Sequence, residues 1–113
     1  MRQGSCHCGK IAFTLAAEPA EAIECNCSHC SRKGYLLAFF PRDTLTLTTP
    51  RENLATYTFN RHVLQHHFCP TCGCAPFAEG QGPKGPTVAV NLRCVQGIDR
   101  GALIVKQVDG KSF

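Results

Sequence analysis

The sequence has no tryptophan, few other aromatic residues and no long apolar run. Seven Phe and two Tyr give only a modest core in a chain of 113 residues, so bound metal or disulfides would help to stabilise it. No apolar segment approaches the length of a membrane-spanning helix, and we expect no membrane association. The stretch "MRQGSCHCGK" also lacks the charged segment, apolar run and cleavage site of a secretory signal.

The sequence also has little excess of charge of either sign. The formal net charge is +4, without a run of Lys and Arg or a stripe of alternating basic and aromatic residues. Nucleic-acid binding is therefore not indicated. If seven cysteines bound two Zn²⁺ as thiolates, the net change of three negative charges would leave about +1.

Cysteine, in contrast, is abundant. The nine cysteines are an odd number, and Cys6 and Cys8, like Cys25 and Cys27, are separated by a single residue. That spacing suits metal binding better than a disulfide free of strain. We therefore expect bound metal and a reducing, cytoplasmic setting.

The periodicity predicts strands almost throughout. Several short segments alternate or are continuously apolar, and Pro or Gly ends most of them. The predicted strands are "KIAFTL", "YLLAFF", "TLTLT", "LATYTF", "TVAVNL" and "ALIVKQV". One helical turn is possible near "HCSRK", and "GQGPKGP" at 80–86 is expected to be a mobile loop. We predict a mainly β fold of packed antiparallel sheets held by metal, with residues 1–113 forming one domain.

The segment "FCPTCG" is the strongest single motif. Its C-x-x-C spacing followed by Gly is that of a zinc knuckle. A redox pair of cysteines would instead need a helix directly after the motif, and the sequence predicts none there. A tetrahedral site needs two more ligands, which "CHC" can supply. The resulting set for a structural Cys₄ site is Cys6, Cys8, Cys69 and Cys72.

The segment "CNCSHC" contains three further thiols, Cys25, Cys27 and Cys30. Three protein ligands and an open position are typical of catalytic zinc. The spacing alone leaves an alternative open, in which Cys74, Cys94 or a histidine completes a second closed site.

The segments "GSCHCG", "CNCSHC" and "FCPTCG", with the tail "VNLRCVQGID…VDG", resemble the glutathione-dependent formaldehyde-activating enzyme family, which also includes centromere protein V. The resemblance covers nearly the whole chain. It implies a small zinc-stabilised β-tent with two Zn²⁺ per chain. Cys6, Cys8, Cys69 and Cys72 match the positions of the structural zinc ligands, and 25, 27 and 30 match those of the catalytic zinc ligands.

The resemblance also implies a carbon–sulfur lyase activity, S-(hydroxymethyl)glutathione ⇌ glutathione + formaldehyde. A thiolate sulfur is a soft ligand suited to a zinc ion already held by cysteines. Because three thiolates leave the ion with a charge near −1, we favour activation of the sulfur over polarisation of the carbonyl.

Glutathione carries carboxylates, so we looked for cationic partners. Arg32 and Lys33 directly follow the three-cysteine segment and are the first candidates. The remaining cationic candidates are Arg42, Arg61 and Arg93.

Several histidines and two cysteines have less certain roles. We expect His7 to point away from the metal and His29 to flank the open site or handle protons. One of His62, His66 and His67 could serve as an acid or base near zinc, although alternating faces of a strand are the ordinary interpretation. Cys74 and Cys94 are expected to be packed in the interior.

A second hypothesis is a non-catalytic zinc scaffold that binds a protein or senses metal or redox state. So short a chain leaves little room for a complete glutathione pocket, so a homodimer is also possible.

Overall fold

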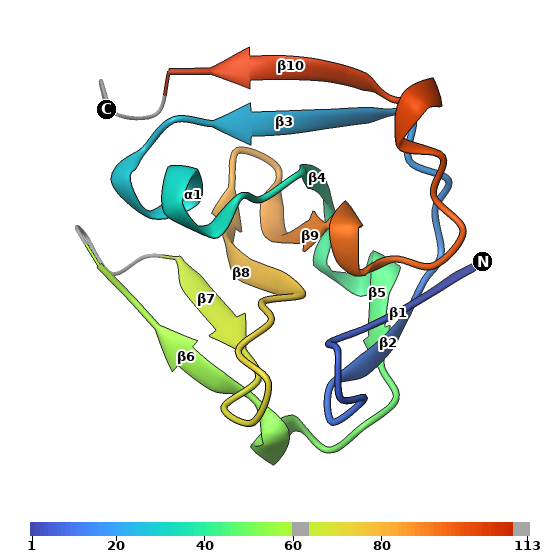
Figure 1. Ribbon diagram of the computed structural model, residues 1–113, viewed down its shortest axis with the longest axis vertical. Coiled ribbons are helices and arrows are strands. Elements are labelled where there is room, and N and C mark those ends of the chain that lie inside the picture. Colours follow the sequence, from blue (N-terminus) through green and yellow to red (C-terminus); the bar gives the residue numbers. More distant parts are fainter. Residues whose placement is uncertain (60–63, 110–113) are drawn as a thin grey trace.

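The computed structural model describes residues 1–59 and 64–109. These residues form a mainly β structure of two sheets, which confirms the predicted fold class. A three-stranded sheet has the order β1-β2-β5 and a seven-stranded sheet the order β10-β3-β4-β9-β8-β7-β6. Figure 1 shows the large sheet extending from β10 at the top of the view to β6 at the lower left, with the small sheet on the right.

The strands have three to seven residues and the helical segments three to six. The strands are β1 (Arg2–Ser5), β2 (Ala12–Leu15), β3 (Glu21–Cys25), β4 (Leu37–Pro41), β5 (Leu45–Leu47), β6 (Ala55–Tyr57), β7 (Gln65–Phe68), β8 (Phe77–Gly82), β9 (Gly85–Asn91) and β10 (Ile104–Val108). The helical segments are α1 (Ser28–Lys33) and the 3₁₀ turns η1 (Arg42–Thr44), η2 (Arg51–Asn53), η3 (Leu92–Cys94) and η4 (Arg100–Ala102). No helix among them is long and apolar enough to cross a membrane.

Alternation along the predicted strand "KIAFTL" builds the contact between the sheets. Ile11, Phe13 and Leu15 are at most 1% exposed. The Phe13 ring meets Phe77 of β8 edge-on, with ring centroids 6.1 Å apart. Because full burial of one such side chain stabilises a fold by about 1.5–3 kcal/mol, this face largely determines how the small sheet packs on the large one.

The β8–β9 hairpin corrects the loop predicted at 80–86. The strands pair as far as Gly82 opposite Gly85, and only Pro83 and Lys84 form the turn. Gly85 has φ +114°, a backbone conformation that residues with a side chain rarely adopt. The glycines that suggested a mobile loop instead permit a tight connection between two long strands.

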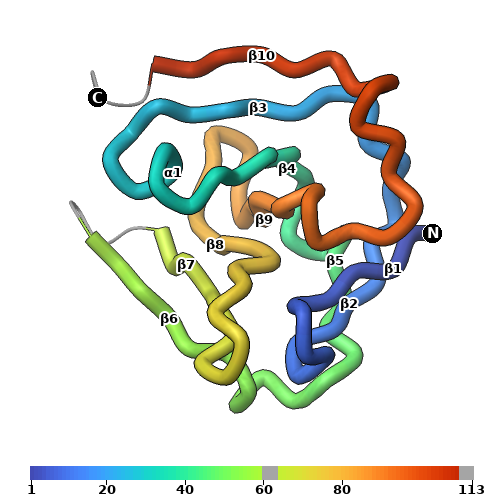
Figure 2. The backbone as a smooth tube through the Cα atoms, viewed as in Figure 1, coloured from blue at the N-terminus to red at the C-terminus, as the bar shows by residue number. Residues whose placement is uncertain are grey.

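The pairing of β10 with β3 corrects the prediction of wholly antiparallel sheets. The two strands run parallel, with Ile104 opposite Glu21 and Val108 opposite Cys25. Figure 2 shows these distant parts of the chain side by side along one edge of the structure. An ion pair also links the two strands, with Lys106 Nζ 3.3 Å from Glu21 Oε1. Periodicity could not predict its direction, because β10 is mostly exposed and has one neighbour.

The predicted helical turn is α1. The sulfur of Cys27 accepts a hydrogen bond from the N–H of Cys30 and caps the helix start. Gly34, with φ +69°, ends it in the left-handed region and donates its N–H to the carbonyl of Cys30. These two caps hold Cys30 on the buried side and leave Arg32 exposed.

Candidate metal centres

The first candidate centre consists of Cys6, Cys8, Cys69 and Cys72, whose sulfurs all lie within 4.8 Å of one another. Cys8 Sγ lies 3.8 Å from Cys6 Sγ and 3.5 Å from Cys69 Sγ. Cys6 and Cys69 are buried, at 2% and 0% exposure. The two halves come from the β1–β2 and β7–β8 connections, so this cluster joins the two sheets.

Both halves of the four-cysteine cluster are built in the same way. The Ile11 N–H donates to Cys6 Sγ at 3.3 Å, and the Cys72 N–H donates to Cys69 Sγ at 3.4 Å. Gly9 and Gly73, with φ +85° and +82°, allow each turn to reverse. Amide donors stabilise thiolates. Four sulfurs so arranged fit zinc, which prefers tetrahedral thiolate ligation.

The backbone also favours ionised sulfur at Cys72. The N–H groups of Cys74 and Cys8 lower the pKa of the Cys72 thiol to about 5. A thiolate already present near neutral pH suits a metal ligand, because binding then requires no further proton release at that sulfur.

The second candidate centre consists of Cys25, Cys27 and Cys30, whose sulfurs also lie within 4.8 Å of one another. Cys25 ends β3, Cys27 caps α1 and Cys30 lies inside the helix. Burial opposes ionisation of Cys27, but hydrogen bonds from the N–H groups of Cys30 and His29 and from neighbouring thiols lower its pKa overall. Burial raises the pKa of the Cys30 thiol.

Among residues 1–59 and 64–109, no fourth His, Cys, Asp or Glu joins this three-cysteine cluster. All nine cysteines fall within these residues, and each is a free thiol. Cys74 and Cys94, the residues that could have closed the site, belong to neither cluster. Cys94 instead accepts a hydrogen bond from Asn91 at 3.8 Å. The donor set of three thiolates fits zinc with a position left for another ligand.

A cavity of about 300 Å³ adjoins the three-cysteine cluster. The cavity is lined by His29, Lys33, Tyr35, Tyr57, His66, His67 and Phe68. Tyr35 and Phe68 also belong to the apolar cluster that contains Cys30 and packs against Cys25 and Cys27, so the cavity wall and the three thiols share residues. Burial, with the nearby charge of Cys30, raises the pKa of Tyr35 to about 12. We call this space the aromatic pocket.

The cationic candidates occupy different places. Lys33 lines the aromatic pocket, with Nζ 5.6 Å from the centroid of the Phe68 ring. Arg32 donates to the Ser28 carbonyl on its own helix at 2.8 Å. Arg93 donates to the Gly34 carbonyl at 2.9 Å.

Two further candidates, Arg61 and His62, lie outside the described residues. His7 is exposed between the two ligands of its turn. His29 and His66 face one another across the pocket, with ring centroids 4.4 Å apart. The ring of His67, in contrast, is hydrogen-bonded at Nδ1 to Thr56 Oγ1 at 2.9 Å and at Nε2 to Glu79 Oε1 at 2.6 Å.

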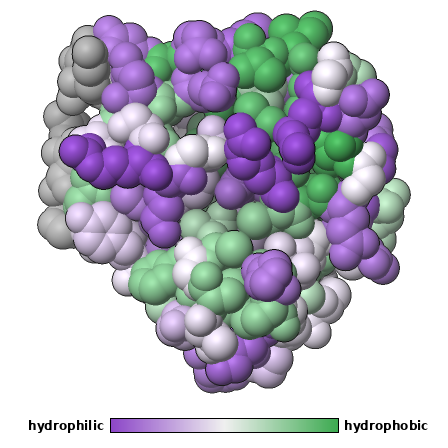
Figure 3. All heavy atoms as spheres, in the orientation of Figure 1, coloured by the Kyte–Doolittle hydropathy of each residue, from purple (hydrophilic) through white to green (hydrophobic). Residues whose placement is uncertain are grey.

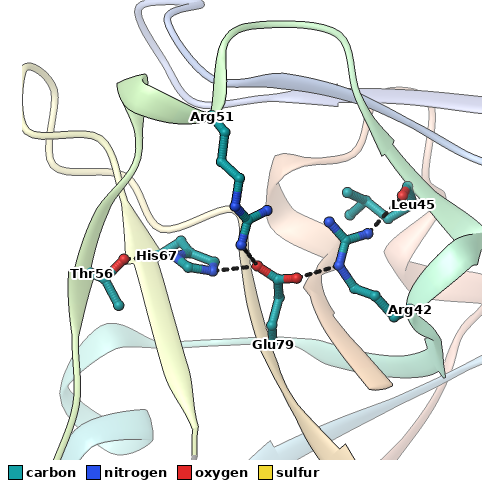
Figure 4. Close-up of polar contacts among 6 residues, drawn as sticks. All are labelled: Arg42, Leu45, Arg51, Thr56, His67 and Glu79. Carbon is teal, nitrogen blue, oxygen red and sulfur yellow. Dashed lines mark hydrogen bonds and ion pairs between the residues drawn. The ribbon is translucent and has the colours of Figure 1, made fainter. Parts of the chain in front are cut away.

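Sequence reasoning missed the ion network around Glu79. Figure 4 shows the side chains of His67, Arg42 and Arg51 paired with the two carboxylate oxygens of Glu79. Although burial opposes ionisation, these three partners hold the pKa of Glu79 down at about 2. Nothing in "FAEGQG" indicates this role, because the partners come from η1, η2 and β7.

The visible face of the molecule is mixed in hydropathy. Figure 3 shows hydrophobic and hydrophilic residues interspersed over the visible face. Hydropathy alone therefore does not single out a binding face in this view.

Two comparisons with known proteins agree with one another. A family model described as glutathione-dependent formaldehyde-activating enzyme matches residues 1–104. The crystal structure of a Rhodobacter sphaeroides protein, a structural genomics target, superposes with a TM-score of 0.76 at 29% sequence identity. The match covers 92% of this chain and 99% of that one.

Proposed function

The chain belongs to the glutathione-dependent formaldehyde-activating enzyme family, and on this premise we propose that it is a zinc-dependent carbon–sulfur lyase. Its reaction is S-(hydroxymethyl)glutathione ⇌ glutathione + formaldehyde, or the same exchange with another small thiol. The observation that carries the proposal is the three-cysteine cluster, which has no fourth ligand among the described residues and lies beside a cavity.

Cys25, Cys27 and Cys30 would hold the zinc of this centre. Zinc bound there supplies an acceptor for the substrate sulfur and lowers the pKa of the thiol. In the cleavage direction the carbon–sulfur bond breaks and its electron pair stays on sulfur. The hydroxyl oxygen forms the carbonyl and releases its proton. In the reverse direction each change is undone.

The four-cysteine cluster would hold a second zinc with a structural role. Its sulfurs are supplied entirely by the protein, and its two turns already point amide donors at them. A closed thiolate site contributes directly to folding energy. We thus propose two Zn²⁺ per chain.

Lys33 is the better of the two proposed partners for a glutathione carboxylate. Both side chains are exposed, but Lys33 lines the aromatic pocket, whereas Arg32 donates to the Ser28 carbonyl of its own helix. An ammonium beside the cavity can bind a carboxylate arm while the thiol approaches the three-cysteine cluster. The free state of all nine thiols supports a reducing compartment, and we propose the cytoplasm.

The test is NMR exchange spectroscopy on formaldehyde and glutathione with the zinc-loaded protein. We expect faster exchange with the wild type and none with Cys27→Ser, while Cys94→Ser keeps the wild-type rate. Cys94 makes a matched control because it is a cysteine outside both clusters. A protein with two zinc ions and no acceleration would instead be the non-catalytic zinc scaffold.

A further inference from the structure

His66 lies in the interior with nothing to satisfy its polar atoms. Its side chain is 7% exposed, and neither ring nitrogen has a hydrogen-bond partner among residues 1–59 and 64–109. The adjacent His67 shows the ordinary arrangement, with both nitrogens engaged by Thr56 and Glu79. An unsatisfied buried polar group costs about 1–3 kcal/mol, so a fold keeps one where a ligand supplies the missing partner.

Stacked rings surround His66 and shape the aromatic pocket. The rings of His66 and Phe59 lie 5.4 Å apart at 23°, and those of His66 and Tyr35 lie 6.5 Å apart at 14°. His29 completes the arrangement at 4.4 Å from His66 and 5.4 Å from Tyr57. Nearly parallel rings offer faces on which a flat group can stack.

The pocket is suited to an uncharged group. Burial lowers the pKa of His66 to about 4, so its ring is neutral at pH 7. Lys33 is the one Lys, Arg, Asp or Glu side chain among the described residues that line the pocket. Because no described Asp or Glu lines the pocket, a cation brought in among these rings would lose its hydration and find no anionic partner there.

Size gives the second constraint. The volume of about 300 Å³ is typical of the smaller ligand pockets. The aldehyde carbon and oxygen of formaldehyde would fill little of it.

We propose that the aromatic pocket receives the aldehyde-derived part of the substrate, that this part is an uncharged aromatic group, and that His66 hydrogen-bonds the hydroxyl of the adduct. The assignment rests on the proposed function for its reaction. A neutral imidazole has one donor and one acceptor nitrogen, so it can both donate to and accept from a hydroxyl. Tyr35, shared with the three-cysteine cluster, joins the pocket to the sulfur site.

The first test uses benzyl alcohol, which carries a ring and a hydroxyl but has no thiol chemistry. It is titrated into the zinc-loaded wild type at pH 7 while the ring ¹⁵N resonances of the histidines are followed. We expect saturable shifts at His66 and smaller ones at His29 and at His67, whose two ring nitrogens are already engaged by Thr56 and Glu79. Benzylammonium, of the same shape but charged, should bind at least about tenfold more weakly because the pocket disfavours charge. Unchanged His66 resonances would overturn the assignment.

The second test compares variants. His66→Phe keeps a ring but removes the hydrogen bond and should weaken benzyl alcohol binding about fivefold, as expected for one neutral hydrogen bond. His66→Gln keeps an amide and should retain more of the affinity. Phe39→Leu, at an exposed site outside the pocket, serves as the control. Equal affinity in the wild type and both His66 variants would contradict the role of His66.

Exchange of glutathione with benzaldehyde and with formaldehyde separates this proposal from the proposed function. A higher catalytic rate with benzaldehyde, reduced in His66→Phe more than the rate with formaldehyde, supports both. Benzyl alcohol binding without acceleration of either aldehyde overturns the proposed function but leaves the pocket assignment intact. Acceleration with formaldehyde alone, without benzyl alcohol binding, overturns the pocket assignment and leaves the function.

Discussion

The sulfur of Cys27 serves both the fold and the candidate metal centre. It accepts the N–H of Cys30 at 3.2 Å as the cap of α1, and it belongs to the three-cysteine cluster. The two roles need different chemistry. A helix cap needs any side-chain acceptor, whereas a thiolate zinc site needs sulfur.

Two substitutions at Cys27 should separate these roles. Cys27→Ser keeps a capping oxygen and Cys27→Ala removes it, so we expect the alanine variant to be less stable by about 1 kcal/mol with the second site empty. Both variants should bind one zinc fewer than the wild type. Urea unfolding and metal analysis measure the two effects. Equal stabilities would show that the cap contributes nothing.

The two cysteine clusters could be predicted from the sequence because their signal is local. Cys6 with Cys8, Cys69 with Cys72, and the three thiols of the second cluster each lie within a few residues of one another. Tyr35, His66 and Glu79 carry no such signal. Their importance depends on partners from other elements, which spacing does not contain.

At the scale of elements, alternation predicted the strands that bury one face. β2, β4 and β5 lie close to the predicted segments, and each packs a side against the core. The sequence did not predict β1, β3 and β8, because these segments contain glycine, charge or small residues. These strands form through pairing with neighbours rather than through their own pattern.

The Glu79 network links β7, β8, η1 and η2, so its removal should loosen several elements at once. We expect Glu79→Gln to destabilise the protein by about 2 kcal/mol, since it leaves Arg42 and His67 without their anionic partner. Glu18→Gln, in an exposed pair with Arg2, should change little. Thermal unfolding of the zinc-loaded proteins at pH 7 measures both. A neutral effect of Glu79→Gln would contradict the role of the network.

The buried His66 on β7 should also make the stability of the protein depend on pH. Unfolded histidine takes up a proton near pH 6.5, but folded His66 does so only near pH 4. Protonation therefore favours the unfolded chain, and the contribution of His66 is complete above pH 6.5 and falls as the pH drops towards 4.

We expect the wild type to lose about 2 kcal/mol more than His66→Phe across this interval. Taking the difference between the two zinc-loaded proteins in denaturant unfolding removes the contribution of acid-induced metal loss. Parallel pH profiles would show that His66 is protonated equally in both states.

For the whole molecule, the four-cysteine cluster is the feature that joins the two sheets. Its turns connect β1 with β2 and β7 with β8, and a single bridge, Gly4 to Val95, adds backbone contact with the small sheet. The sequence predicted that this cluster ties distant segments together. The angle between the sheets and the parallel pair at the edge depend on packing and could not be predicted. The homodimer stays a prediction.

The two clusters should therefore release zinc very differently. Loss from the three-cysteine cluster breaks no link between sheets, and a chelator can occupy its open position. Loss from the four-cysteine cluster removes the connection between sheets and costs on the order of 10 kcal/mol of binding energy that supports folding. We expect a chelator to remove one zinc per chain rapidly with the circular dichroism spectrum unchanged, and the second only as the protein unfolds.

Cys25→Ser should abolish the rapid phase of zinc release, and Cys72→Ser should abolish the slow phase. Simultaneous release of both ions from folded protein would show that the two centres do not differ in this way.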